Sequence, residues 1–162
     1  MTLSIIPIGT IHSPFKKLSG MPIQPSGAKG AEGTIILDPK YQEGLSDLEG
    51  FSHIILLYHF HQSKGFELMV TPFLDNTRRG LFSTRAPRRP NPIGLSIVRL
   101  KARKENRLAI LDIDVLDGTP LIDIKPYVPG FDIKKVTAAG WLEKTQEKAG
   151  STRSDNRFID DP

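Results

Sequence analysis

The sequence predicts an all-β fold, a small and mostly antiparallel β-barrel with long loops and a short C-terminal helix or tail. Short runs of β-branched and alternating apolar residues follow one another along the 162-residue chain. The 14 glycines and 13 prolines supply turn signals between these runs, and hardly any segment shows helical spacing. Many short strands separated by turn signals are typical of barrels and sandwiches.

The N-terminal third alternates expected strands with irregular segments. Residues 4–12 are rich in isoleucine and predict a strand, in which Pro7 indicates an edge or a bulge. Residues 13–30 form a loop broken by prolines and glycines, and loops of this length in compact domains are usually functional or disordered. A short strand is expected at 34–37, followed by a short surface helix or turn over 39–50.

Residues 52–61 form the clearest strand, because their side chains alternate between two faces. The faces consist of Ile54, Leu56, Tyr58 and Phe60 on one side, and of His53, Ile55, Leu57, His59 and His61 on the other. Two histidines on one face are a plausible start for a metal site, but no third ligand is identifiable, and strand histidines more often form hydrogen bonds. We therefore expect no metal, and we interpret His61-Gln62 at the strand end as a ligand contact.

Two further pairs of strands and a turn complete the expected barrel. The pairs are 70–74 with 81–84, and 94–103 with 107–115, and a turn at 117–120 leads into a last strand at 121–124. In the strand 107–115 the side chains expected to face the core are Ala109, Leu111, Ile113 and Val115, with Asp112 and Asp114 pointing outward.

The composition becomes polar after the last expected strand. We expect residues 1–130 to form the barrel domain and residues 131–162 a polar segment that packs on the barrel or extends from it. Trp141-Leu142 is expected to anchor a short helix to the barrel, and residues 151–162 to form a tail that is mobile or docked on a partner.

Positive charge is concentrated in one segment. Residues 76–104 hold nine Lys and Arg and no carboxylate, whereas the rest of the chain holds 13 cations and 18 acids, so the net charge of +4 hides an uneven distribution. Such asymmetry points to an anionic partner. The chain has no cysteine, no basic region of a signal peptide at its N-terminus, and no apolar run near the ~20 residues of a membrane helix. We expect a single-domain, cytoplasmic protein without a membrane partner.

Residues 84–96 are the strongest candidate for a binding loop. Three prolines within six residues stiffen the loop, which then loses less entropy on binding a ligand. Its arginines can present guanidinium groups to carboxylate or phosphate, Asn91 offers a donor and an acceptor, and Gly94 permits close approach of a ligand. The alternative is a proline-rich surface connection whose arginines are only solvated.

Several of these segments occur together in one known family. They are residues 85–96, Phe51-Ser52-His53 with Phe60-His61-Gln62, Asp117-Gly118-Thr119-Pro120 with Asp123-Ile124-Lys125-Pro126-Tyr127, and the loop pieces Phe15-Lys16 and Pro22-Ile23-Gln24-Pro25. In this order and spacing they resemble the TsaA/TrmO-like family, over about residues 5–127. The resemblance implies an all-β, S-adenosylmethionine-dependent tRNA methyltransferase that works as a homodimer and methylates N6 of threonylcarbamoyl-adenosine next to the anticodon.

The resemblance also implies which residues touch the cofactor. Matched motif by motif, these are Pro22, Ile23, Gln24, His61, Gln62, Arg85, Leu95, Asp117, Gly118, Thr119 and Pro120. Ile23 stands where the family often has an arginine, so its contact is expected through the backbone or through apolar atoms. The chain also largely lacks the C-terminal extension of the larger bacterial members.

Roles in the implied reaction can be assigned to a few of these residues. Asp117 and Asn91 are the catalytic candidates, as hydrogen-bond acceptors for the reacting amine. Arg85 is expected to meet the methionine carboxylate of the cofactor or the threonine carboxylate of the substrate. The candidates for tRNA phosphate contacts are Arg78, Arg79, Arg88 and Arg89. Two alternatives remain, a non-catalytic nucleotide- or RNA-binding module that keeps the cofactor pocket, and a metal-dependent hydrolase built on the three histidines.

Overall fold

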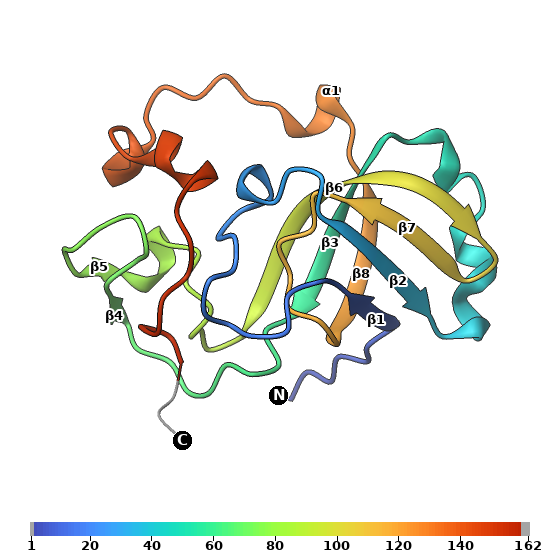
Figure 1. The fold of residues 1–162 in the computed structure, drawn as a ribbon, viewed down its shortest axis with the longest axis horizontal. Coiled ribbons are helices and arrows are strands. Elements are labelled where there is room, and N and C mark those ends of the chain that lie inside the picture. Colours follow the sequence, from blue (N-terminus) through green and yellow to red (C-terminus); the bar gives the residue numbers. More distant parts are fainter. Residues whose placement is uncertain (1, 160–162) are drawn as a thin grey trace.

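The computed structural model describes residues 2–159, and six of its strands close into a barrel (Figure 1). Around the barrel the strands run β1 (Gly9–His12), β2 (Glu32–Leu37), β7 (Arg107–Leu111), β6 (Ile93–Lys104), β3 (His53–His59) and β8 (Thr119–Pro126). Each neighbouring pair is antiparallel, including β8 with β1, so the barrel has no open edge. The predicted all-β barrel is confirmed.

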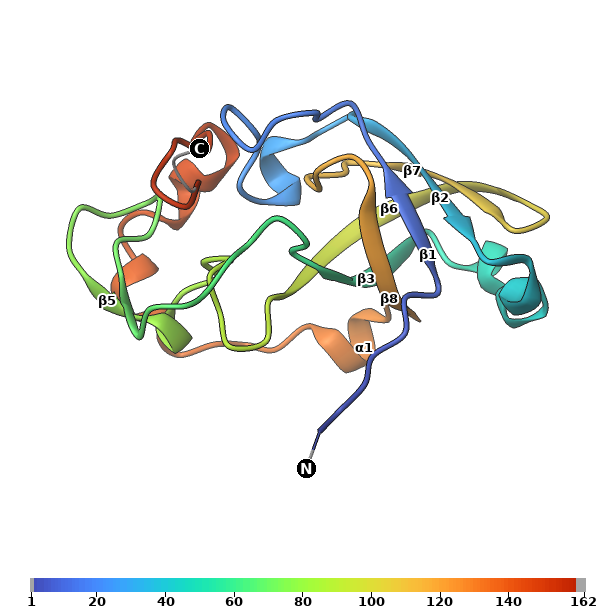
Figure 2. The same cartoon turned by 90° about the horizontal axis from the view of Figure 1, so that it is seen from below.

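A smaller lobe lies beside the barrel. It contains the short ribbon β4 (Met69–Val70) and β5 (Arg79–Gly80), and the C-terminal segment lies at the same end in both views (Figures 1 and 2). The helices of the described residues are all short. They are the α-helix α1 (Pro129–Asp132) and the 3₁₀ turns Pro25–Gly27, Pro39–Leu45, Leu48–Gly50, Leu81–Ser83, Gly140–Leu142 and Gln146–Gly150.

The alternation of β3 builds the barrel core as predicted. Ile54, Leu56 and Tyr58 are at most 5% exposed, whereas the residues between them are half-buried. Gly94 on β6 pairs with Tyr58, and a side chain at Gly94 would collide with the Tyr58 ring, so glycine lets the two strands and the ring approach closely. The inward residues from the other strands and the segment after β7 include Ile11, Ile35, Val98, Leu108, Ile110, Ile113 and Leu121.

Three expected strands are shorter than predicted or absent. The strand predicted over 4–12 begins only at Gly9, where β2 and β8 both lie alongside. The strand predicted over 70–74 is reduced to Met69–Val70. Residues 81–84 form a 3₁₀ turn instead, because the backbone N–H and the hydroxyl of Thr84 both donate to the Leu81 carbonyl oxygen, at 3.0 and 2.7 Å.

For residues 107–115, the prediction of which side chains point to the core is wrong in the first half and at Asp114. Leu108 and Ile110 face the core in place of Ala109 and Leu111. β7 ends at Leu111 and Asp112 follows with a φ of 68°, so the alternation changes phase, and Ile113 and Val115 are buried as predicted. The same change turns Asp114 toward a cavity in place of solvent.

Candidate active site

A cavity of about 570 Å³ lies where the barrel meets the smaller lobe. Its wall is mostly apolar and comes from the loop 18–24, the end of β3 with the residues after it, the proline-rich loop 84–95, the segment 114–119 and the C-terminal segment 141–159. Concave and mostly apolar pockets of ~300–1,000 Å³ with a few polar groups are typical of sites for small molecules and cofactors. Residues distant in sequence therefore form one candidate site.

Most of the residues that the sequence assigned to the cofactor line this cavity. Eight of the eleven do so, namely Pro22, Ile23, Gln24, His61, Gln62, Arg85, Leu95 and Thr119. Asp117, Gly118 and Pro120 do not, and neither does Asn91, which is exposed. The structure thus separates the two catalytic candidates from the main cavity.

Three polar side chains from three segments form a hydrogen-bonded chain at one wall of the cavity, which Tyr58 and Asp114 line and behind which Ser96 is buried. Ser96 Oγ on β6 donates to Asp114 Oδ1 at 2.6 Å, and Tyr58 Oη on β3 lies 3.0 Å from Ser96 Oγ. Because the serine proton is directed to the carboxylate, the tyrosine hydroxyl donates to Ser96. Burial raises the pKa of Asp114 to about 6, against the lowering effect of the Ser96 hydrogen bond and the Arg85 charge. Burial, and next the charge of Asp114, raise the pKa of Tyr58.

The proline-rich loop is tied to the N-terminal loop and to itself. Arg85 Nη1 donates to Gln24 Oε1 at 2.9 Å, which joins two predicted cofactor residues at the cavity. Arg89 Nη1 donates to the carbonyl oxygen of Thr84 at 2.9 Å and to that of Ala86 at 3.3 Å, and its guanidinium lies over the Phe82 ring. Arg85 thus presents an exposed cation at the cavity, while Arg89 holds the shape of the loop.

His61 lies against Thr119 at the cavity wall. Its Nδ1 atom is 3.4 Å from Thr119 Oγ1, whose proton is directed to the Leu116 carbonyl oxygen at 2.7 Å. Burial, and then the neighbouring His59, lower the pKa of His61. The imidazole is therefore neutral at neutral pH, in agreement with a contact to a ligand and not with a cationic role.

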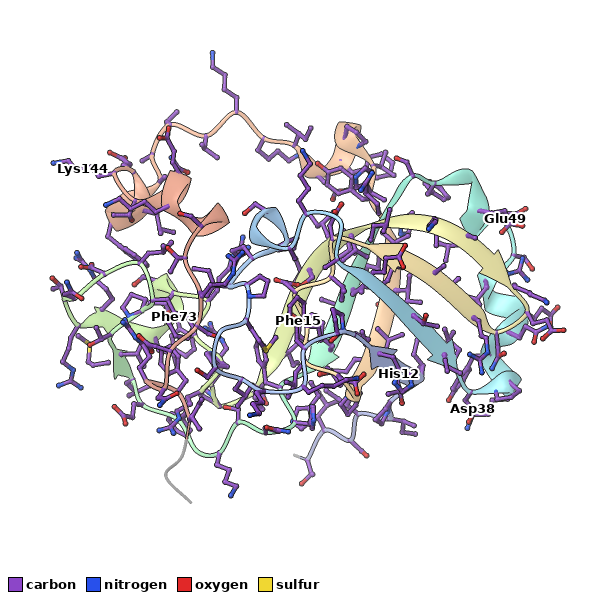
Figure 3. The ribbon with its side chains drawn as sticks, in the orientation of Figure 1. His12, Phe15, Asp38, Glu49, Phe73 and Lys144 are labelled. Atoms are coloured by element: carbon purple, nitrogen blue, oxygen red, sulfur yellow. The ribbon has the colours of Figure 1, made fainter. Side chains whose placement is uncertain are left out.

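Asp117 lies in a second, shallower hollow beside β1. Its carboxylate accepts a hydrogen bond from the Ser13 backbone N–H at 3.0 Å and pairs with Lys16 Nζ at 2.7 Å and His12 Nδ1 at 3.4 Å. The Lys16 hydrogen bond, followed by the Ser13 N–H, lowers the pKa of Asp117. His12, the last residue of β1, lines this hollow. In Figure 3 it lies far from Phe73, a residue of the smaller lobe that lines the main cavity. Asp117 fixes the N-terminal loop to the turn before β8.

The C-terminal segment closes the cavity, which the sequence did not predict. Its backbone pairs with the N-terminal loop, because Gly20 N–H donates to the Ser154 carbonyl and Ser154 N–H to the Met21 carbonyl, both at 2.8 Å. Trp141 Nε1 donates to the Ser83 carbonyl oxygen at 2.8 Å, so this bond anchors Trp141 on the smaller lobe and not, as was expected, on the barrel. Residues 151–159 are thus held by the chain itself and do not form the mobile or partner-docked tail expected there. Residues 160–162 lie outside the described part. The other residues of the C-terminal segment that line the cavity are Leu142, Gln146, Ala149, Asp155, Phe158 and Ile159.

Carboxylates from other parts of the chain neutralise part of the positive charge of residues 76–104. Four cations of this segment pair with carboxylates, as Arg79–Asp75 at 2.7 Å, Arg99–Asp112 at 2.6 Å, Lys101–Glu32 at 3.1 Å and Arg103–Glu49 at 3.3 Å. Arg78 is exposed and donates to the Met69 carbonyl oxygen at 3.1 Å. The sequence pattern therefore overstates the local charge, because all four carboxylates come from outside the segment.

Metal and membrane sites were also sought. Within residues 2–159 no three His, Cys, Asp or Glu side chains are grouped so that they could hold a metal ion. In the same range, no helix has the length and apolar character needed to span a bilayer.

Comparison with known proteins supports the motif assignment. A family model described as the N-terminal domain of tRNA-methyltransferase O matches residues 10–133. The chain is 57% identical over 153 residues to a Pyrococcus abyssi protein named a probable S-adenosyl-L-methionine-binding protein, which covers 94% of this chain and 83% of that protein. It is 42% identical over 132 residues to the Escherichia coli tRNA (adenine(37)-N6)-methyltransferase, covering 75% of this chain and 56% of that enzyme.

A solved structure agrees with the sequence comparisons. The crystal structure of TrmO from Pseudomonas aeruginosa superposes with a TM-score of 0.74 at 44% identity, covering 86% of this chain and 62% of that one. The chain thus spans little more than half of the Escherichia coli enzyme and less than two thirds of the crystallised protein. The family model covers most of the chain and the barrel is shared, so the chain belongs to the TrmO/TsaA-like family of S-adenosylmethionine-dependent tRNA methyltransferases.

Proposed function

We propose that this chain binds S-adenosylmethionine in the main cavity and transfers its methyl group to N6 of threonylcarbamoyl-adenosine next to the anticodon of tRNA. One observation carries the proposal. Eight residues scattered between positions 22 and 119, which the family motifs assign to the cofactor, line a single cavity of about 570 Å³. Family membership and the names of the relatives in Escherichia coli and mouse support a tRNA adenine as the acceptor.

The cavity fits the chemistry of the cofactor. Its mostly apolar wall, with Ile23 and Leu95, suits an adenine ring and an aliphatic chain, and the Arg85 guanidinium suits a carboxylate. The side-chain oxygen of Gln24 accepts a hydrogen bond from Arg85, so this bond positions both residues for their predicted contacts with the cofactor. The bound cofactor supplies an electrophilic methyl group on a sulfonium, and the protein chiefly has to align donor and acceptor, which can contribute ~7–11 kcal/mol.

We further propose that the active form is a homodimer. The cavity rim exposes the apolar side chains of Ile93 and Leu95, and the neighbouring ribbon exposes Leu68, Met69 and Phe82. Exposed apolar surface beside a site is typical of an interaction surface. Asn91 and Asp117 lie outside the cavity of their own chain, so either residue could contact a ligand in a cavity only from a second copy.

For tRNA we propose phosphate contacts through Arg78, Arg79, Arg88 and Arg89. Arg79 pairs with Asp75 and Arg89 holds the shape of the proline-rich loop, so the test uses Arg78, which is exposed, together with Arg88 of the same loop. Replacing both by alanine should weaken tRNA binding and flatten its salt dependence by ~0.7–0.9 in the log–log slope for each lost phosphate contact. Lys101→Ala, which removes a cation paired with Glu32, is the matched control. An unchanged slope in the double variant would exclude these two arginines from the tRNA interface.

The decisive experiment uses methyl-labelled S-adenosylmethionine with purified tRNA that carries or lacks the threonylcarbamoyl group. Mass spectrometry of the digested nucleosides should show a methyl added only to the threonylcarbamoyl-adenosine. Methylation of unmodified adenosine would keep the enzyme class and overturn the substrate. Cofactor binding without transfer to either tRNA would favour the non-catalytic binding module.

A further inference from the structure

The half-buried carboxylate of Asp114, on the cavity wall, has no role in the binding scheme above. Among residues 2–159, two carboxylates line the main cavity, and the other, Asp155, pairs with Arg157 at 2.7 Å. Asp114 forms no ion pair within the same described residues; one of its oxygens accepts the Ser96 hydroxyl at 2.6 Å. Asp114 follows the core residue Ile113 and precedes the buried Val115, so its backbone position is fixed by packing on both sides.

The two hydroxyl groups behind Asp114 are oriented toward it. Tyr58 donates to Ser96, and Ser96 donates to Asp114, so both protons point along the chain to the carboxylate. Tyr58 in turn is held by Gly94, which leaves no space for the ring to shift in that direction. Such a chain orients the carboxylate, while the surrounding apolar wall keeps it a better proton acceptor than a solvated aspartate.

We propose that Asp114 is the group that accepts the proton of the methylated nitrogen. This inference rests on the proposed function, since it needs an N–H that is lost when the methyl arrives. In the transfer the bond between the methyl carbon and sulfur breaks, and its electron pair stays on sulfur. The N6 nitrogen forms the new bond to carbon, its N–H bond breaks with the electrons left on nitrogen, and the proton passes to the Asp114 carboxylate.

The charge balance of this step favours an apolar cavity. A sulfonium cation and a carboxylate anion disappear, and a neutral thioether and a neutral carboxylic acid remain. Oppositely charged groups lose their charge together, so no new charge has to be solvated by the mostly apolar wall. When the products leave, the acid releases its proton to water, because a group that titrates near pH 6 is ionised at neutral pH.

The groups that face Asp114 set its titration. Tyr58 from β3 and Ser96 from β6 belong to the hydrogen-bonded chain, and Arg85 from the proline-rich loop is the cation whose charge lowers its pKa. His61 lines the same cavity, and its own pKa is lowered, so it adds no positive charge at neutral pH. Asp117, by contrast, is paired with Lys16 in the other hollow and is a weaker base.

The test is single-turnover methyl transfer by the full chain to the tRNA that the wild type methylates. Asp114→Asn should lower the transfer rate by about 10²–10⁴-fold, while cofactor affinity measured by calorimetry stays within about threefold. Asp112→Asn is the matched control, because this carboxylate two residues earlier pairs with Arg99 away from the cavity, and it should transfer at the wild-type rate. A rate for Asp114→Asn within threefold of the wild type would overturn the inference and leave the proposed function standing.

A pH profile keeps the inference testable if Asp114→Asn does not fold. The wild-type rate should fall as the pH drops through about 6, where Asp114 becomes protonated. Ser96→Ala removes a hydrogen bond that lowers the pKa of Asp114, so this acidic limb should move to higher pH. A limb that stays in place in Ser96→Ala excludes Asp114 as the titrating base. Absence of transfer by the wild type to any tRNA would instead overturn the proposed function.

Discussion

Asp114 and Asp117 stand three residues apart in the chain, in two hollows of opposite character. Asp114 lines a mostly apolar cavity, where burial raises its pKa to about 6. Asp117 lies between Lys16, His12 and the Ser13 N–H in a polar hollow, and its pKa is lowered. The two residues are of one type and close in sequence, so their surroundings cause the difference in pKa. Desolvation makes Asp114 the stronger base, whereas ion pairing keeps Asp117 ionised in a structural contact.

The largest expected effect is the pH dependence of stability that Asp114 imposes. Its pKa is 3.8 in the exposed state and about 6 in the folded state, so the folded state binds the proton more tightly. The stability from this group is complete below pH 3.8 and is lost as the pH rises through 6, by about 3 kcal/mol. The free energy of unfolding of Asp114→Asn, measured by urea titration between pH 4 and 7.5, should lack this loss. Parallel curves for variant and wild type would contradict the burial of the charge.

The next effect tests the packing behind the cavity. Gly94→Ala places a methyl group against the rings of Tyr58 and Phe60, and overpacking of this kind costs about 1–3 kcal/mol. Denaturant titration should show that loss, and the displaced Tyr58 should also shift the pH profile of methyl transfer. Gly44→Ala is the control, because a side chain there meets no atom within 4 Å.

Asp117→Asn should have a smaller effect with the opposite pH dependence. Loss of the Lys16 pair and of a charged acceptor for the Ser13 N–H should cost about 1 kcal/mol at pH 7. Because its pKa is lowered in the folded state, this stability is present above pH 3.8 and is lost as the pH falls through the folded pKa. A difference between variant and wild type that persists at pH 2 would show that the amide disturbs packing and not charge.

The smallest effect is expected at the rim of the polar hollow. Lys101 pairs with Glu32 at 3.1 Å, and both side chains are more than half exposed. Lys101→Ala should change the free energy of unfolding by less than about 0.5 kcal/mol, and less again in high salt. A loss above 1 kcal/mol would show that this pair holds β2 to β6 more firmly than an exposed ion pair does.

The sequence predicted the barrel and eight residues of the cavity wall for different reasons. The alternation in β3 is local and strong, so the inward residues Ile54, Leu56 and Tyr58 follow directly from it. The eight cavity residues were predicted from the order and spacing of the family motifs. These motifs indicate which distant segments lie together in space, which no local pattern can show. The same reasoning placed Asp117 at the centre of the site, because a turn motif does not show which side of the barrel its side chain faces.

Other features depend on tertiary contacts. Asp114 was expected to point outward because period-two alternation was extended past Leu111, and the positive φ of Asp112 that interrupts it has no sequence signal beyond an aspartate. The C-terminal wall was missed since its polar composition resembles a tail, whereas Ser154 is held by backbone bonds to Gly20 and Met21. The presence of one tryptophan near the end was the available hint, because a large aromatic residue in a polar segment needs a surface to cover.

That tryptophan is an intrinsic fluorescence probe of the cavity. Trp141 is the single tryptophan of the chain, its indole N–H is fixed on the Ser83 carbonyl oxygen, and its ring lines the cavity with the Arg79 guanidinium 5.7 Å from its centre. Intrinsic tryptophan fluorescence therefore comes from one known position on the cavity wall. The unlabelled protein can be titrated with S-adenosylmethionine, its demethylated product or adenosine while the fluorescence of Trp141 is recorded. The titrations would rank these ligands by their affinity for the cavity.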